Sequence, residues 1–133
     1  MKSTVGHINL YVSDLNKSYN FYNKLLTLLD YKEIVNEKKV FAFMNGGTTI
    51  WFDQAEGKYV IKGFHRKRVG LNHIAFRVNS KEDVDKFCNE FLKPNKIPTL
   101  YDTPKPFPEY EEGYYAVYFE DPDRIKIEVA YYL

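Results

Sequence analysis

The sequence predicts an α+β fold built from two successive modules, each ordered β-α-β-β-β. The stretch Gly6–Asp14 (GHINLYVSD) returns as Asn72–Ser80 (NHIAFRVNS), which places His7 and His73 66 positions apart (73 − 7). The helical segments that follow keep this offset at Phe21 and Phe87, Asn23 and Asn89, and Leu26 and Leu92. A constant offset through a strand and a helix is typical of a duplicated module.

The first module shows strand and helix periodicities in turn. Residues 5–12 alternate, with aliphatic side chains on one face and His7 on the other, which predicts a strand with one apolar side. Ser13 or Asp14 can cap a helix over 15–28, whose apolar residues recur every three or four positions and should cover that side. Turns rich in Asn and Gly then separate three predicted strands, at 31–36, 39–44 and 48–53.

The second module repeats this order with one insertion. A strand at 70–78 is followed by a helix over 81–93, capped by Ser80 and ended by Pro94. After a proline-punctuated segment come two strands, at 114–120 and 124–132. The sequence therefore divides into module 1 (1–54), a polar connector (55–69) and module 2 (70–133), which together form a single domain.

The insertion falls in or near the proline-rich segment of the second module. Trp51 of the first module aligns best with Glu128 of the second, 77 positions away (128 − 51), so about 11 residues have been added relative to the offset of 66. An insertion in one copy of a repeat is often the place where function was added, because loops tolerate insertions and carry binding residues.

Composition and charge exclude several classes of function. The 133 residues carry a net charge of +1, and the only basic cluster, 65–68, is short and reads as a solvated loop. No apolar run is long enough to span a membrane, and a single cysteine, Cys88, allows no disulfide framework. We therefore expect no nucleic-acid or membrane partner and a cytoplasmic location.

Two histidines and one glutamate are candidate metal ligands. His7 and His73 open the first strand of each module on its non-core face, and the alternation of the last strand puts Glu128 on the same face as the histidines. Two imidazoles and one carboxylate form a suitable ligand set for a divalent ion with positions left open. Each residue also has an ordinary structural explanation, as a hydrogen-bonded strand histidine or as a glutamate that protects a sheet edge.

The chain resembles the vicinal oxygen chelate superfamily, which includes glyoxalase I, extradiol dioxygenases, and fosfomycin- and bleomycin-resistance proteins. The resemblance rests on HINLYVSDL from His7, SYNFYNKLL from Ser18, GLNHIAF from Gly70 and FEDPDRIKIE from Phe119. It implies a mixed β-sheet that curls into a cup, with the helices on the outside. It also implies that the protein often forms a homodimer. It also implies a divalent metal (Mn, Ni, Zn or Fe(II)) held by His7, His73 and Glu128.

One position departs from the glyoxalase I pattern. Glyoxalase I resembles this sequence but has a fourth carboxylate or amide ligand at the position that matches Trp51. An indole offers only an N–H donor and can neither coordinate a hard cation nor move a proton. Glyoxalase I activity is therefore not expected. Trp51 is interpreted either as an aromatic wall for the substrate or as part of the core between the modules.

Other residues on the inferred cleft face are candidates for binding the substrate. This cleft is expected if the two modules pack as a pseudo-symmetric pair, so that their non-core faces meet. The candidates include Asn9, Tyr11 and Arg77, and Arg77 could anchor a carboxylate or phosphate unless it is a surface arginine paired with a nearby acid. Among the alternating tyrosines 114, 115 and 118, one set should line the cleft and the other pack inward. The sequence alone does not decide which set does so, and Tyr115 is taken as the candidate.

Two classes of function remain open. The first is a metal-dependent enzyme, of the lyase, isomerase, transferase or dioxygenase type, that acts on a small oxygenated substrate. The metal would stabilise an enolate or alkoxide as negative charge develops. The alternative is a metal-free protein that sequesters a small molecule, as in the bleomycin-resistance type, and the high content of Tyr (12) and Phe (10) supports it.

Overall fold

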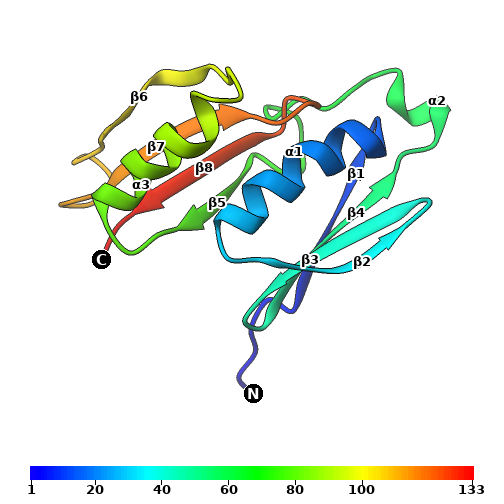
Figure 1. Ribbon diagram of the computed structural model, residues 1–133, viewed down its shortest axis with the longest axis horizontal. Helices are drawn as coiled ribbons and strands as arrows, with labels where there is room; N and C mark the ends of the chain where they lie inside the picture. The colour runs from blue at the N-terminus through cyan, green and yellow to red at the C-terminus, as the bar shows by residue number, and fades with distance from the viewer. The chain divides into compact units, whose positions relative to one another are not determined.

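A computed structural model describes all residues, 1–133, as two compact units, Met1–Gly63 and Phe64–Leu133. Each unit is a four-stranded mixed sheet with a helix packed on one face (Figure 1). The predicted α+β class with two β-α-β-β-β modules is therefore confirmed. No helix combines the length and the apolar character that crossing a membrane would require.

Unit 1 follows the predicted order of elements. Its elements are β1 (His7–Val12), α1 (Leu15–Leu28), β2 (Lys32–Glu37), β3 (Val40–Asn45), β4 (Thr48–Gln54) and a short helix α2 (Gly57–Val60). The strand order in the sheet is β1-β4-β3-β2, with β1 parallel to β4 and the other pairs antiparallel. The short helix α2, in the connector, is the one element of unit 1 that the sequence did not predict.

Helix α1 begins where the sequence places a cap. Asp14 accepts a hydrogen bond from the backbone N–H of Lys17 at 3.0 Å, and the Gln54 side chain accepts another from the backbone N–H of Leu15. The buried face of the helix then packs on the sheet, where the Tyr22 ring lies 4.2 Å from that of Phe52. The apolar side of the sheet thus forms the core of unit 1.

Unit 2 repeats the arrangement of unit 1. Its elements are β5 (His73–Arg77), α3 (Lys81–Phe87), a π-helical turn (Cys88–Leu92), β6 (Thr99–Pro106), β7 (Tyr115–Glu120) and β8 (Lys126–Tyr131). The strand order is β5-β8-β7-β6, the counterpart of the order in unit 1. Ser80 caps α3 by accepting from the N–H of Asp83, and Phe87 and Phe91 pack on Phe119 of β7.

The proline-rich segment forms an edge strand, β6. The sequence did not predict this strand, because proline is rare inside sheets. An edge strand tolerates proline because one of its sides needs no hydrogen-bond donors. Its pairing with β7 is interrupted between Leu100 and Lys105, where Tyr101 and Asp102 have φ values of 59° and 53°. The buried Thr103 hydroxyl spans this bulge: it donates to the Leu100 carbonyl and accepts from the Tyr118 N–H.

The two sheets have equivalent registers. In unit 1, His7 pairs with Thr49 and Asn9 with Trp51, while in unit 2, His73 pairs with Lys126 and Ala75 with Glu128. Counted from the histidine of each unit, Trp51 and Glu128 therefore occupy the same place in the ladder. This agrees with the alignment made from sequence.

Candidate functional site

The site in unit 2 is organised around Glu128, a carboxylate on the face of the sheet opposite α3. The register places Glu128 between Ala75 of β5 and Tyr118 of β7. Its side chain is only 2% exposed. A carboxylate this deeply buried must be hydrogen-bonded or paired, because burial in an apolar medium penalises its charge.

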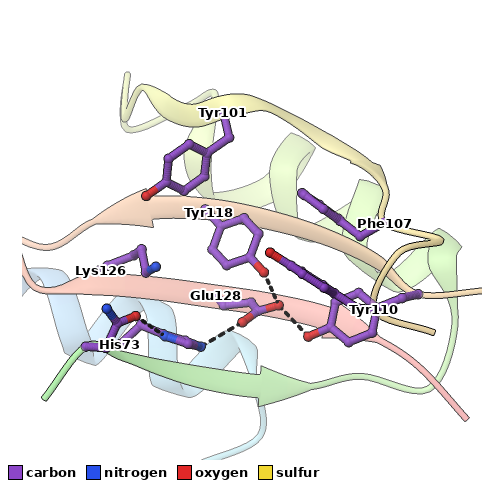
Figure 2. A pocket seen from close by; sticks show the side chains of 9 residues that line it. His73, Tyr101, Phe107, Tyr110, Tyr118, Lys126 and Glu128 are labelled. Carbon is purple, nitrogen blue, oxygen red and sulfur yellow. Dashed lines mark hydrogen bonds and ion pairs between the residues drawn. The ribbon is translucent and has the colours of Figure 1, made fainter. Parts of the chain in front are cut away.

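Two tyrosine hydroxyls bind one oxygen of this carboxylate. The Tyr114 hydroxyl donates to Glu128 Oε1 at 2.6 Å. The Tyr118 hydroxyl donates to the same atom at 2.8 Å (Figure 2). Burial, together with the hydrogen bond to Glu128, raises the pKa of both tyrosines well above its usual range. Both hydroxyls therefore stay protonated at neutral pH and act as permanent donors to Oε1.

The second oxygen faces a histidine. His73 Nε2 lies 3.1 Å from Glu128 Oε2, and His73 Nδ1 lies 2.7 Å from the side-chain oxygen of Asn72. Since the Asn72 oxygen is an acceptor, the proton of a neutral imidazole sits on Nδ1 and the Nε2 lone pair points toward the carboxylate. Two lone pairs facing each other at this distance require a proton or a metal cation between them.

A cavity of about 560 Å³ opens beside this pair, within unit 2. Five aromatic side chains and one lysine dominate its lining (Figure 2). The complete lining is Asn72, His73, Tyr101, Phe107, Tyr110, Tyr114, Tyr118, Lys126 and Glu128. A concave aromatic surface with a few convergent polar groups is the usual form of a small-molecule site.

Comparison with known proteins assigns the fold to a family. The profile of the Glyoxalase/Bleomycin resistance protein/Dioxygenase superfamily matches residues 4–129 of this chain. The chain belongs to this superfamily. Among solved structures, a Bacillus halodurans protein provisionally described as a glyoxalase superposes with a TM-score of 0.90 at 35% identity, covering 98% of this chain and 97% of that one.

Other proteins are similar over almost the whole of this chain. An uncharacterized protein of Bacillus subtilis, YqjT, is 40% identical, with 93% of this chain and 95% of that protein covered. Metallothiol transferase FosB of Staphylococcus saprophyticus is 27% identical, with 97% and 77% covered. The fosfomycin resistance protein FosX of Listeria monocytogenes is 26% identical with a TM-score of 0.71, and the match covers 100% and 96%.

Of the three ligands that the superfamily resemblance implies, the structure brings His73 and Glu128 together. Within unit 2 these two side chains form a pair rather than a triad. His7 lies in unit 1, exposed at the start of β1. Asn9 and Tyr11 share its face of the sheet, and Trp51 lies beside Asn9 on the neighbouring strand.

Two of the predicted substrate-binding residues lie elsewhere in unit 2. The Tyr115 hydroxyl donates to Asp85 of α3, so Tyr115 is on the helix-covered face and Tyr114 and Tyr118 line the cavity instead. Arg77 donates from Nε to the Tyr132 carbonyl at 3.1 Å, with its guanidinium 4.9 Å from the Tyr132 ring. Arg77 is outside the cavity lining.

Several lining residues were not singled out from the sequence. Asn72 lies next to His73 in the repeated motif, and Tyr101, Phe107 and Tyr110 come from the proline-rich insertion. The available signal was the density of aromatic residues in that insertion. The bulge in β6 and the loop after it bring these aromatic side chains together, where they form one wall of the cavity.

Proposed function

We propose that this chain is a divalent-metal-dependent enzyme that acts on a small oxygenated substrate. In this proposal His73 and Glu128 supply two metal ligands and His7 supplies a third. The observation that carries it is the separation of 3.1 Å between His73 Nε2 and Glu128 Oε2, both facing the cavity of unit 2.

This separation suits two ligands of one ion. Ligand atoms about 2.1 Å from a divalent ion, at about 90° to one another, lie about 3 Å apart. The hydrogen bond from His73 Nδ1 to Asn72 orients the imidazole and leaves Nε2 as the donor atom, as is usual for metal-bound histidines. The donor set therefore fits a divalent cation.

Tyr114 and Tyr118 prepare the carboxylate for this role. By donating to Oε1 they supply the hydrogen bonds that a buried carboxylate needs. They also fix the rotation of the carboxylate, so that Oε2 stays directed at His73. Neither tyrosine needs to contact the metal.

The proposed role of His7 is supported by the repeat. His7 occupies in unit 1 the ladder position that His73 occupies in unit 2, and its side chain is exposed. Two imidazoles and a carboxylate leave positions open for oxygen atoms of a substrate. A bound metal would act there as a Lewis acid that polarises those oxygens.

The name of one relative, FosB, favours a transferase among the possible reactions. Metallothiol transferase FosB and fosfomycin resistance protein FosX both match almost the whole chain, at 27% and 26% identity. Trp51 argues against glyoxalase I chemistry, since an indole supplies no fourth oxygen ligand and cannot shuttle a proton. We therefore propose a transferase, the class of enzyme that the name of FosB describes.

Metal uptake tests the proposal. Protein purified without chelator and loaded with Mn²⁺, Ni²⁺ or Zn²⁺ should bind one ion per chain by elemental analysis and should gain thermal stability. His73→Ala, Glu128→Gln and His7→Ala should each abolish stoichiometric uptake. His65→Ala is the matched control, because His65 is the third and last histidine of the chain and lies exposed in the connector.

Unchanged uptake in Glu128→Gln or His73→Ala would contradict the metal site, and unchanged uptake in His7→Ala would remove the third ligand alone.

A second candidate function, metal-free binding of a small molecule, is favoured by the five aromatic rings that line the cavity. Absence of both metal uptake and a thermal shift in the wild-type protein would select it.

A further inference from the structure

We propose that the cavity of unit 2 binds a small organic anion with a flat, unsaturated body, whose anionic group pairs with Lys126. This inference rests on the proposed function, because it names the substrate class of the same site. It assigns to Lys126 the anion-binding role that the sequence suggested for Arg77.

Lys126 is a cation without an acidic partner. Its ammonium lies 5.7 Å from the centre of the Tyr101 ring and 5.5 Å from that of Tyr118, and none of the ion pairs in the structure includes it. Aromatic faces attract an ammonium group but do not neutralise its charge. The lysine is therefore held at the cavity wall with its charge available to a ligand.

The carboxylate best placed to neutralise Lys126 is already bound. Glu120 is the register partner of Lys126 on β7. Its two oxygens are taken by Arg66, at 2.5 Å, and by Arg124, at 3.5 Å. Glu120 is thus shared between two arginines, which leaves the Lys126 ammonium group free to bind an anionic ligand.

Other polar groups of the lining are committed within the protein. The hydroxyls of Tyr114 and Tyr118 donate to Glu128. The Asn72 side chain binds His73 through its oxygen and the Arg66 carbonyl through its nitrogen. Since these groups are engaged within the protein, the cavity offers a ligand mainly ring surfaces, the hydroxyls of Tyr101 and Tyr110, and the Lys126 ammonium group.

The rings are arranged as flat walls. Phe107 and Tyr110 are parallel, with centroids 5.4 Å apart and an interplanar angle of 3°. Phe107 and Tyr101 both meet the Tyr118 ring edge to face, with centroid distances of 5.6 Å and 5.5 Å respectively. Rings packed on one another in this way present flat faces and edges, on which a planar unsaturated body can stack or pack edge-on better than a puckered one.

The spacing along β8 lets one small molecule reach both ends of the site. Lys126 and Glu128 are two residues apart on the same face of the strand, which separates their Cα atoms by about 7 Å. A benzene ring substituted at opposite positions spans a similar length. An anion at Lys126 could therefore present an oxygen atom to the His73–Glu128 pair.

Three probes of matched size test the inference on chelator-treated, metal-free protein. Benzoate has the charge and the ring, benzamide lacks the charge, and cyclohexanecarboxylate lacks the flat body. Titration followed by NMR should show benzoate binding about tenfold or more tightly than benzamide, as expected for a charge-assisted hydrogen bond. Benzoate should also bind more tightly than cyclohexanecarboxylate.

Variants locate the binding. Lys126→Gln should weaken benzoate binding about tenfold or more, while Lys126→Arg should retain most of it. Lys105→Gln is the matched control: Lys105 lies 5.5 Å from the Phe107 ring but outside the cavity lining, and its loss should leave binding unchanged. Circular dichroism and thermal melting verify that each variant is folded.

The outcomes separate this inference from the proposed metal site. Failure of wild-type protein to bind benzoate, equal affinity for benzamide, or unchanged affinity in Lys126→Gln would overturn the anion site even if metal uptake is intact. Equal affinity for cyclohexanecarboxylate would overturn the requirement for a flat body. Because the titrations use metal-free protein, a failure of metal uptake in the earlier experiment leaves these results valid.

Discussion

The two units place different side chains at one equivalent pair of positions. In unit 1, Trp51 of β4 pairs with Ala42 of β3, while in unit 2, Glu128 of β8 pairs with Tyr118 of β7. Each pair combines an aromatic ring with a smaller group. In unit 1 the ring is on β4, the counterpart of β8, whereas in unit 2 it is on β7, the neighbour of β8. Only in unit 2 does this leave room for a carboxylate and provide a hydroxyl to bind it.

This difference shows that the two faces of each sheet meet different requirements. The helix-covered face must remain apolar in both units, since it forms the core; Val12, Phe52, Ile127 and Val129 are all buried there. The opposite face does not pack against a helix and could therefore diverge. Function is expected where the faces differ and stability where they agree, and three predictions test this.

The largest expected effect concerns the equivalent core positions Phe52 and Val129. Phe52→Ala removes a fully buried ring that contacts Tyr22 and stacks on Phe41, and should lower the free energy of unfolding by about 3–5 kcal/mol. Val129→Ala should cost about 1.5–3 kcal/mol. Urea denaturation measures both. The exposed Ile61→Ala should change stability by less than about 0.5 kcal/mol, and a larger loss from it than from Val129→Ala would refute the assignment of the core.

The next effect distinguishes the volume of Glu128 from its charge. Glu128→Ala strands the hydroxyls of Tyr114 and Tyr118 and should cost the metal-free protein about 2–4 kcal/mol. Glu128→Gln keeps an acceptor for both hydroxyls and places an amide donor opposite His73 Nε2, so stability should stay within about 1 kcal/mol of wild type. Chemical denaturation of chelator-treated protein measures the difference. Equal losses in the two variants would show that the tyrosines do not depend on this acceptor.

The smallest effect concerns pH. Tyr114 and Tyr118 have pKa values raised above the ordinary 10.0 in the folded chain, first through burial and then through Glu128. Below about pH 10 both states of the chain keep these protons. Above that pH the unfolded chain releases them first, so stability should fall as pH rises. The double variant Tyr114→Phe/Tyr118→Phe should flatten this alkaline slope in denaturation curves, and an unchanged slope would argue against the two hydrogen bonds.

The repeat explains why so much of the fold could be predicted from sequence. Asp14 and Ser80 occupy equivalent positions, and each caps its helix through the N–H three residues on, as their side chains indicate. The predicted bounds of α1, 15–28, agree with Leu15–Leu28. Local rules sufficed there because capping and amphipathicity act over neighbouring residues.

The candidate site was only partly predictable. Alternation along a strand separates Tyr115 from Tyr118, but it does not say which of them faces the helix. That depends on packing against Asp85 of α3. Arg77 donates a hydrogen bond to the Tyr132 carbonyl instead of lining the cavity, and no residue pattern reveals a backbone acceptor of this kind. The β6 bulge was hidden because its conformation depends on the tertiary hydrogen bonds of Thr103.

The prolines of β6 have a consequence for how the folded protein behaves at high concentration. β6 is an edge of its sheet, and edges with free N–H groups can recruit strands from other molecules. Pro104 and Pro106 lack those groups, and the bulge between Leu100 and Lys105 twists the remaining backbone away from a regular ladder. The strand that carries Tyr101 to the cavity is therefore also a poor template for aggregation.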